Sequence, residues 1–274
     1  MVIYFCLFFI RCNSLFYYPD SKQYSTPAKL GLIYEDVYFY SKDLTRLHGY
    51  WIKADSPKGT IVQVHGNAQN ISAHFYSLAW VVSKGYNLFT FDYRGYGQSE
   101  KKVISRYGLI QDTQAAIEWA QQVPISKRGK CFILHGQSLG GAILMVAVSQ
   151  MPLSKDTRLV LDSTFPSYQK VAASIMKKKW YLWPLQFLAY WLITDDSAPE
   201  QNLQNLAGYP KLVIHSESDE VVPFDQGENL FRLLPPPKEK LFVQKARHIG
   251  ALGKKFFESR KKYLHFVDCT RNLP

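Results

Sequence analysis

A serine between glycines, Gly136-Gln137-Ser138-Leu139-Gly140, is the part of this chain with the clearest chemical meaning. An apolar strand-like run, 130–135, precedes it, and a helix-like run, 141–150, follows it. A sharp strand-to-helix turn needs small residues two positions either side of the serine, because a Cβ there would collide with the neighbouring strand or helix. The same turn aims the Leu139 N–H at the reacting centre, where it can stabilise an oxyanion. The pattern predicts Ser138 as a nucleophile, although five residues alone also fit an ordinary glycine-rich turn.

A serine hydroxyl is a poor nucleophile at neutral pH, so this hypothesis requires a histidine that accepts its proton. The chain has seven histidines. His248 follows the last predicted strand, 240–243, and precedes the last predicted helix, so it can hang over the strand ends beside Ser138. We predict His248 as the base, with His215, which ends a strand, as the weaker candidate.

A carboxylate is needed to orient the histidine, and two aspartates are candidates. Asp219 follows the strand predicted over 211–215, and we predict it as the orienting group. Asp162 is the alternative because it ends the strand predicted over 158–161. Its competing role is to cap or tie the loop that it begins.

The stretch His65-Gly66-Asn67-Ala68-Gln69-Asn70 follows another predicted strand, at the place where a second oxyanion donor belongs. We predict the Asn67 backbone N–H as that donor, with Ala68 as the next choice. A pair of aligned donors can contribute several kcal/mol to a transition state, since removing one typically costs about 3 kcal/mol.

Strand-like and helix-like segments alternate along most of the chain, which predicts a mainly parallel sheet with helices on both faces. In such sheets ligands collect beyond the carboxyl ends of the strands, where each candidate residue falls. Two alternating runs, 37–40 and 47–53, open the sheet as a strand pair. The segments that follow are strands at 59–65, 87–91, 130–135, 158–161, 211–215 and 240–243, and helices at 72–84, 108–122, 141–150 and 225–233.

The segment 165–206 breaks this alternation, and we expect it to form a short helical cap inserted into a single domain that spans 21–274. It is rich in tryptophan, tyrosine and phenylalanine, with Pro166 and Pro184 as breakers and Lys177 to Lys179 inside it. Aromatic side chains in a cap can wall an acyl pocket or rest at a membrane interface. The alternative is that these rings only attach the insertion to the domain.

The first 20 residues form an apolar N-terminal segment, beginning MVIYFCLFFI. Ten apolar residues cannot span a bilayer, which needs about 20. The segment is similar to the end of an export signal that leads to an acylated cysteine, Cys12, but it lacks a basic start and carries Arg11 before that cysteine. An interfacial anchor and an apolar segment packed on the domain are the alternatives, and a chain without export would be cytoplasmic.

The charge of the chain bears on its binding partners, and its cysteines bear on disulfides and metal sites. The formal net charge of +11 is partly clustered in basic runs, which form a solvated face or favour an anionic membrane surface or acidic substrate. No recognised motif supports nucleic-acid binding. The four cysteines show no metal-type spacing and indicate no disulfide framework, and Cys131 is predicted to be a buried, inert thiol.

Together, the stretch 65–68, Phe91-Asp92-Tyr93-Arg94-Gly95-Tyr96-Gly97-Gln98-Ser99, the Ser138 turn, Asp219 with Val222-Pro223, and His248 resemble the α/β-hydrolase superfamily. The order Ser138, Asp219, His248 matches the nucleophile, acid and base order of that fold. Within the superfamily the chain is most similar to BEM46-type serine hydrolases, some bacterial members of which are exported or lipid-anchored. The stretch 92–97 is expected to be structural, with Asp92 tying turn amides.

This resemblance implies an α/β-hydrolase fold and a Ser138-His248-Asp219 triad, with oxyanion donors at Leu139 and Asn67. The expected reaction is hydrolysis of a carboxylic ester or thioester with a small or lipid-like acyl group, with no cofactor and no metal. An amidase or peptidase with the same triad, and a non-catalytic binding protein on a hydrolase scaffold, are the alternatives. The fold does not supply a substrate.

Overall fold

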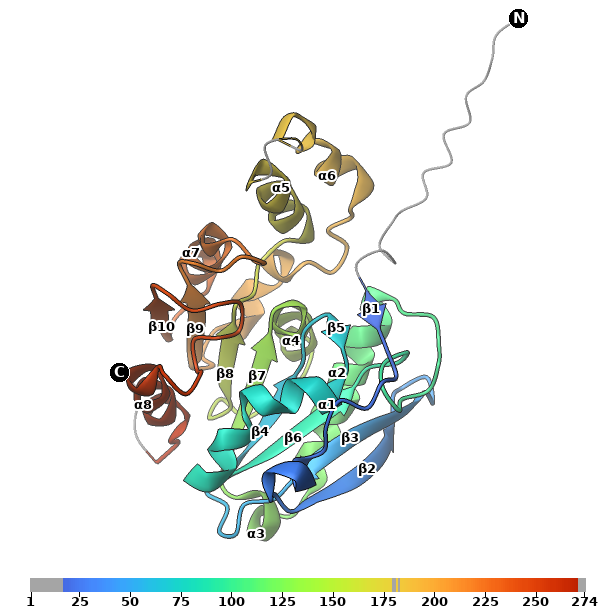
Figure 1. Cartoon of the computed structure of the whole chain (residues 1–274), viewed down its shortest axis with the longest axis vertical. Helices are drawn as coiled ribbons and strands as arrows, with labels where there is room; N and C mark the ends of the chain where they lie inside the picture. Colours follow the sequence, from blue (N-terminus) through green and yellow to red (C-terminus); the bar gives the residue numbers. More distant parts are fainter. Residues whose placement is uncertain (1–16, 179–180, 182, 271–274) are drawn as a thin grey trace, which may run out of the picture.

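Eight strands form one sheet that runs through the molecule (Figure 1). The computed structural model describes residues 17–178, 181 and 183–270. Neighbouring strands are parallel from β10 to β6, and β3 and β2 continue the sheet in antiparallel pairing, which confirms the predicted mostly parallel sheet. The order across the sheet is β10 (Lys238–Val243), β9 (Lys211–Ser216), β8 (Arg158–Asp162), β7 (Cys131–Gln137), β4 (Gly59–Val64), β6 (Tyr86–Asp92), β3 (Arg46–Ile52) and β2 (Tyr34–Tyr40).

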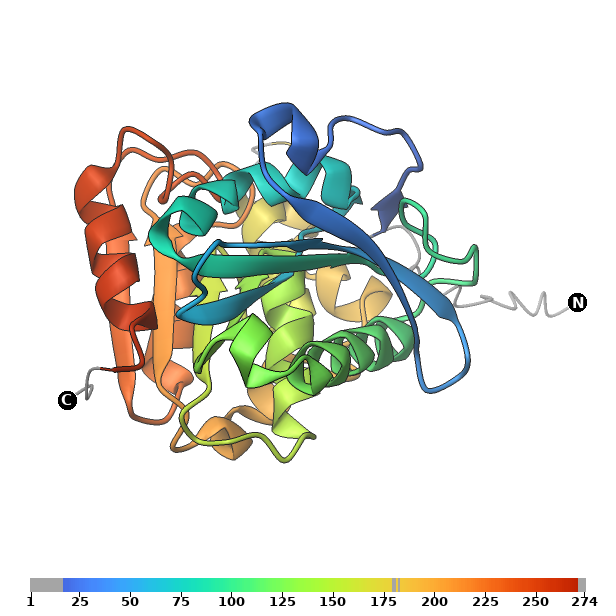
Figure 2. The same cartoon turned by 90° about the horizontal axis from the view of Figure 1, so that it is seen from below.

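Helical segments cover both faces of the sheet, because each central strand is apolar on both sides. Along β7, Leu134 belongs to one buried cluster and its neighbour Ile133 to the other, and β9 divides in the same way at Val213 and Leu212. Successive side chains of a strand point to opposite faces, so each strand contributes to both cores. Figure 2 shows α2 and η4 on opposite sides of β6.

One face carries α2 (Arg106–Gln122), α4 (Leu139–Ser149) and α7 (Phe224–Leu233), and the other carries α1 (Ile71–His74), η3 (Phe75–Ser77), η4 (Ala79–Lys84) and α8 (Phe257–Val267). A short helix, α3 (Ile125–Arg128), precedes β7. The continuous helix predicted over 72–84 was therefore wrong. One α-helical turn is followed there by two 3₁₀ segments. Phe75 in the first, Leu78 between them and Val81 in the second are fully buried at a spacing of three. That spacing matches the three residues per turn of a 3₁₀ helix.

Between β8 and β9 the chain leaves the sheet, and α5 and α6 stand above α4 in Figure 1. This excursion consists of α5 (Tyr168–Lys178), η5 (Trp183–Leu185), α6 (Leu188–Leu192), η6 (Pro199–Gln201) and η7 (Leu203–Leu206). Tyr168 is buried, whereas Phe187, Tyr190 and Trp191 are exposed. Attachment to the domain is therefore the role of some of these rings only.

Two side chains hold the start and the end of this excursion together. The Asp195 carboxylate accepts hydrogen bonds from the Tyr168 N–H at 2.8 Å, from the Gln169 N–H at 3.1 Å and from the Ser167 hydroxyl at 2.6 Å. Arg106, at the start of α2, donates to the carbonyl oxygens of residues 194 and 196 and lies 3.5 Å from the centre of the Tyr168 ring. The excursion is thus tied to the domain by charged hydrogen bonds.

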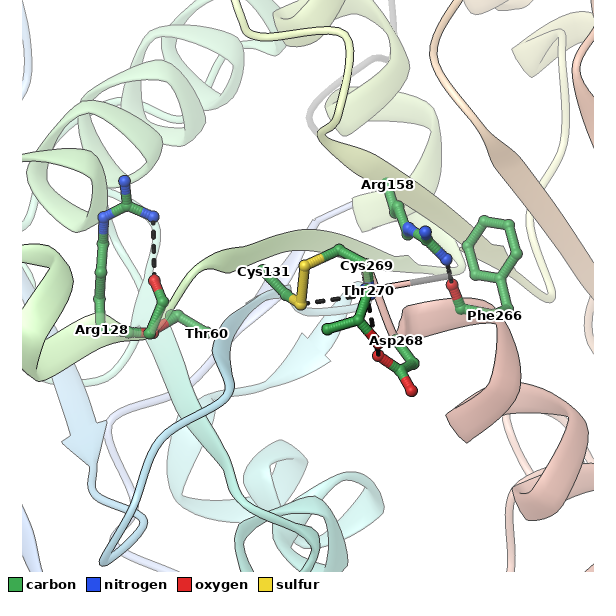
Figure 3. The surroundings of a disulfide bond; sticks show 9 residues. Thr60, Arg128, Cys131, Arg158, Phe266, Asp268, Cys269 and Thr270 are labelled. Atoms are coloured by element: carbon green, nitrogen blue, oxygen red, sulfur yellow. Dashed lines mark hydrogen bonds between the residues drawn. A yellow bond between two sulfur atoms is a disulfide. The ribbon is translucent and has the colours of Figure 1, made fainter. Parts of the chain in front are cut away.

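A disulfide joins Cys131, the first residue of β7, to Cys269, which follows α8 (Figure 3). The expectation that Cys131 is an inert thiol was wrong. Its partner lies 138 positions away in sequence, and only the packing of α8 against the sheet brings the two Cα atoms to 5.3 Å. Beside the bridge, the buried Arg158 side chain donates to the Phe266 carbonyl oxygen. The bridge attaches the segment after α8 to the amino-terminal end of β7.

The apolar start of the sequence and Cys12 lie outside the described residues. In the part of the chain that the structure describes, no helix is both long enough and apolar enough to cross a bilayer. The first described segment, β1 (Tyr18–Pro19), pairs in parallel with β5 (Ala68–Gln69) as a separate two-stranded ribbon.

Candidate active site

Ser138 lies at the sharp turn between β7 and α4, with φ of 53° and ψ of −122°. A left-handed φ is uncommon for a residue with a Cβ and persists only where the surroundings enforce it. The flanking glycines explain how the turn fits. A Cβ on Gly136 would lie 2.5 Å from the Gly141 Cα, and a Cβ on Gly140 would collide with the Val64 carbonyl oxygen. The close approach expected from the sequence pattern is therefore present at both glycines.

The neighbouring strand end supports this turn. The Ser138 N–H donates to the Asp162 carbonyl oxygen at 2.8 Å, and the Thr164 hydroxyl donates to the Ser138 carbonyl oxygen at 2.7 Å. Ser138 is 8% exposed, and its hydroxyl makes no hydrogen bond to another described residue. These bonds fix the Ser138 backbone, and no hydrogen bond joins its hydroxyl to His248 among the described residues.

A buried polar network lies beneath the nucleophile turn and was not predicted from the sequence. The Gln63 amide donates to the Gln137 side-chain oxygen at 2.8 Å, to the Ser77 hydroxyl at 3.0 Å and to the His74 carbonyl oxygen at 3.0 Å. Gln137 in turn donates to Ser77 at 3.1 Å. This network ties the turn to α1 and η3, and a polar residue inside an otherwise apolar strand, Gln63, was the available signal.

His248 and Asp219 form a direct pair after β10 and β9. The His248 Nδ1 lies 2.8 Å from Asp219 Oδ2 and 3.0 Å from Asp219 Oδ1. The Asp219 Oδ1 also accepts the N–H groups of Val221 at 2.8 Å and Val222 at 2.9 Å. With Nδ1 donating to the carboxylate, the imidazole keeps Nε2 free to accept a proton.

The electrostatics keep Asp219 ionised. Burial acts to raise the pKa of this carboxyl, but the hydrogen bonds and the charge of His248, together with the two backbone N–H groups, outweigh it and lower the pKa. Glu220 adds a second acceptor at the same loop, since it accepts from the His248 N–H at 3.3 Å and from Arg247 Nε at 3.1 Å. Glu220 thus links its own loop to the loop that carries His248.

The alternatives for the acid and the base, Asp162 and His215, are both fully buried. Asp162 lies 3.5 Å from His135 Nε2, accepts the Ser163 hydroxyl at 3.1 Å and makes no hydrogen bond to His248. His215 is fully buried, with Nε2 3.0 Å from the Val222 carbonyl oxygen, and its burial lowers its pKa. The structure thus brings Asp219 to His248, whereas Asp162 lies beside His135. The buried His215 lies on another side of Asp219, with Nε2 3.6 Å from Asp219 Oδ2.

The loop after β4 reaches the serine from the other side. A Cβ placed on Gly66 would lie 3.5 Å from the Ser138 Cβ, so residue 66 passes directly beside the candidate nucleophile. Within the described part of the chain, neither the Asn67 N–H nor the Leu139 N–H donates to a protein acceptor. Among the described residues, both predicted donors thus lack a hydrogen-bond acceptor.

The stretch 92–97 makes close contacts with the start of α1 and within itself. Asp92 Oδ1 accepts the Ile71 N–H at 2.9 Å, and Gly97, with φ of 47°, packs so closely on the Asp92 carboxylate that no Cβ fits there. Gly95 has φ of 84°. Through Asp92, this loop binds the backbone at the amino end of α1.

The described residues contain no group of three or more histidine, cysteine, aspartate or glutamate side chains placed to hold a metal ion. A groove of about 1050 Å³ lies between α8, η4 and β10, at the opposite edge of the sheet. Lysine and apolar side chains form much of its lining, and none of the candidate site residues belongs to it.

Comparisons with known proteins show the family to which the chain belongs. The profile of the serine aminopeptidase family, S33, matches residues 55–200. The uncharacterized protein YfhR of Salmonella typhi is 33% identical over 93% of this chain and 88% of its own length. The bem46 protein of Schizosaccharomyces pombe is 27% identical over 90% of this chain and 74% of its own length.

Among solved structures, the Pyrococcus furiosus esterase Pf2001 superposes with a TM-score of 0.70 at 21% identity, covering 91% of this chain and 95% of that one. That similarity shows the shared fold. Together with the family match, it makes this chain a member of the serine aminopeptidase S33 family and a BEM46-like α/β-hydrolase.

Proposed function

We propose that the protein is a serine hydrolase that cleaves carboxylic esters or thioesters through an acyl-enzyme intermediate. One observation carries the proposal. Ser138, at a strained strand-to-helix turn, shares an edge of the sheet with the hydrogen-bonded His248-Asp219 pair and with the N–H groups of Asn67 and Leu139, which lack an acceptor among the described residues. Nucleophile, base, orienting acid and oxyanion donors are the four parts that acyl transfer requires.

In the proposed mechanism the Ser138 Oγ attacks the substrate carbonyl carbon while His248 Nε2 takes the hydroxyl proton. The carbonyl π electrons move to oxygen, and the N–H groups of Leu139 and Asn67 stabilise that negative charge. The C–O or C–S bond then breaks as the imidazolium returns the proton to the leaving group. Water repeats the sequence on the acyl-serine and releases the acid, and Asp219 stabilises the imidazolium in both steps.

Amide or peptide hydrolysis by the same residues is the second candidate, because the matching family is described as a serine aminopeptidase. The two candidates differ in the leaving group. An amine must be protonated by His248 before it leaves, whereas an activated phenolate or thiolate leaves without that help. Matched esters, thioesters and anilides with one common acyl group separate the two.

The test measures initial rates on that substrate series for the parent, Ser138→Ala and the control Ser149→Ala, which lies at the far end of α4. We expect ester or thioester turnover in the parent and in Ser149→Ala, and its loss in Ser138→Ala with an unchanged melting temperature. Anilide turnover that equals ester turnover would establish the amidase alternative. Full activity of Ser138→Ala would overturn the proposal.

A further inference from the structure

The loop that carries the proposed oxyanion donor Asn67 is held from outside the main sheet. Its only strand, β5 (Ala68–Gln69), pairs within the described residues with β1 (Tyr18–Pro19), in the register Tyr18 to Ala68 and Pro19 to Gln69. Gln69 has φ of 66°, which disfavours this conformation for an isolated loop. The first described segment, β1, therefore pairs with a loop that lies 49 positions further along the sequence.

The Asn67 side chain is the centre of this contact. Its Oδ1 accepts the Tyr18 N–H at 3.1 Å and the Tyr96 hydroxyl at 3.2 Å. Tyr96 is fully buried, so its hydroxyl is fixed by packing. The side chain of Asn67 is thereby anchored from two directions, while its backbone N–H has no acceptor among the residues that the structure describes.

Further hydrogen bonds hold both the loop that carries Asn67 and the strand β1. His74 Nε2 lies 2.7 Å from the Ala68 carbonyl oxygen on the other side of the loop. The Asp20 carbonyl oxygen accepts the Gly97 N–H at 2.8 Å, and the Asp20 carboxylate accepts the Asn70 side chain at 2.6 Å. Tyr17 is buried with its hydroxyl beside the Arg106 guanidinium. The strand is thus attached to the domain at both of its ends, independently of Asn67.

We infer that the Tyr18 backbone N–H and the Tyr96 hydroxyl are positioning groups for the oxyanion donor, and that β1 sets the catalytic rate by fixing the Asn67 peptide. The inference rests on the proposed function, because the Asn67 N–H must serve as that donor. Preorganised donors lose most of their effect when displaced, and a misplacement of about 1 Å can cost about 100-fold in rate. Loss of either anchor is expected to act on the transition state rather than on substrate binding.

Paired variants test the two anchors. Tyr18→Pro removes the N–H in an extended segment that tolerates proline, and Tyr18→Ala loses the same exposed ring but keeps the N–H. Tyr96→Phe removes the buried hydroxyl. Tyr38→Phe is its control, since Tyr38 is exposed and its hydroxyl donates to the Gln98 side chain at 3.4 Å. The kcat of Tyr18→Pro should be at least tenfold below that of Tyr18→Ala, and Tyr96→Phe should fall by a similar factor below Tyr38→Phe. KM should stay within about twofold of the parent value, because the ground-state complex does not use the oxyanion.

Two further measurements separate this inference from the proposed function. Binding of a trifluoromethyl ketone, which forms an oxyanion on the nucleophile, should weaken by the same factor as kcat. Amide hydrogen exchange of a peptide covering 66–70 should speed up in Tyr18→Pro and Tyr96→Phe, and this readout requires no turnover. Unchanged exchange in that peptide, or kcat values equal to those of the controls, would overturn the inference. A parent enzyme without turnover would instead contradict the proposed function.

Discussion

Asp219 shows how a single carboxylate can serve a turn and a histidine at once. It accepts two backbone N–H groups from the turn that follows β9 and, at 2.8 Å, the imidazole of His248. From the sequence we predicted Asp219 as the orienting group, with Asp162, at the end of the neighbouring strand β8, as the alternative. Only the three-dimensional course of the His248 loop decides between the two carboxylates.

The two aspartates give the first prediction. Asp219→Asn should lower kcat on an ester by about 10³- to 10⁴-fold, because an amide cannot stabilise the imidazolium. Asp162→Asn should lower it by less than about tenfold, because that side chain faces His135. Steady-state kinetics on both variants checks the ranking, and the reverse order would transfer the orienting role to Asp162.

The lowered pKa of Asp219 gives a prediction for the pH profile. The ordinary pKa of an aspartate is about 3.9, and that of Asp219 is lower. Asp219 therefore stays ionised between pH 5 and 9 and does not titrate in this range. Asp219 should then add no titration of its own to the acid side of the rate profile. We expect a plot of log(kcat/KM) against pH to have an acid limb of slope 1. A slope of 2 in that range would show that a second group titrates.

At the scale of elements, the strands were predicted well because long apolar runs bounded by turns leave few alternatives. The helix predicted over 72–84 failed because its burial repeats every three residues, which the sequence also allows in an α-helix with one apolar face. The Asn67 anchors were missed for another reason. A two-residue strand such as β1 carries no periodicity, and its partner lies far along the chain.

The excursion between β8 and β9 gives a prediction at this scale. Arg106→Met should loosen α5 and α6, since it keeps an apolar stem but loses the hydrogen bonds to residues 194 and 196. Hydrogen bonds to a charged group contribute roughly 1.5–3 kcal/mol, so limited trypsin cleavage after Lys177 and Lys178 should be at least about tenfold faster. Arg46→Met removes an exposed arginine far from the excursion and is the control. Equal cleavage rates in the two variants would show that Arg106 does not anchor these helices.

At the scale of the whole molecule, the candidate active site and the disulfide lie at opposite edges of the sheet. The candidate site lies beyond the carboxyl ends of the strands, whereas the disulfide joins the start of β7 to the end of α8. The bridge was not predictable from sequence spacing, because its two cysteines meet only after the sheet and α8 have packed. The fold class, in contrast, follows from the alternation of elements and from the motifs at the strand ends.

The disulfide gives the prediction for the whole molecule. The double variant Cys131→Ser/Cys269→Ser should unfold at a lower temperature by roughly 5–10 °C, as expected for a loss of about 2–4 kcal/mol. Its kcat should match that of the parent, because the bridge is remote from Ser138. Dithiothreitol should lower the melting temperature of the parent but not that of the double variant. Equal melting temperatures with and without the bridge would contradict this stabilising role.

Covalent labelling with a fluorophosphonate probe, followed by peptide mass analysis, is the most direct test of the central claim that Ser138 is an activated nucleophile. The account predicts one adduct on the peptide that contains Ser138, formed in the parent and in Ser149→Ala and absent from Ser138→Ala. An adduct on another serine, or no adduct on a folded parent protein, would contradict the account.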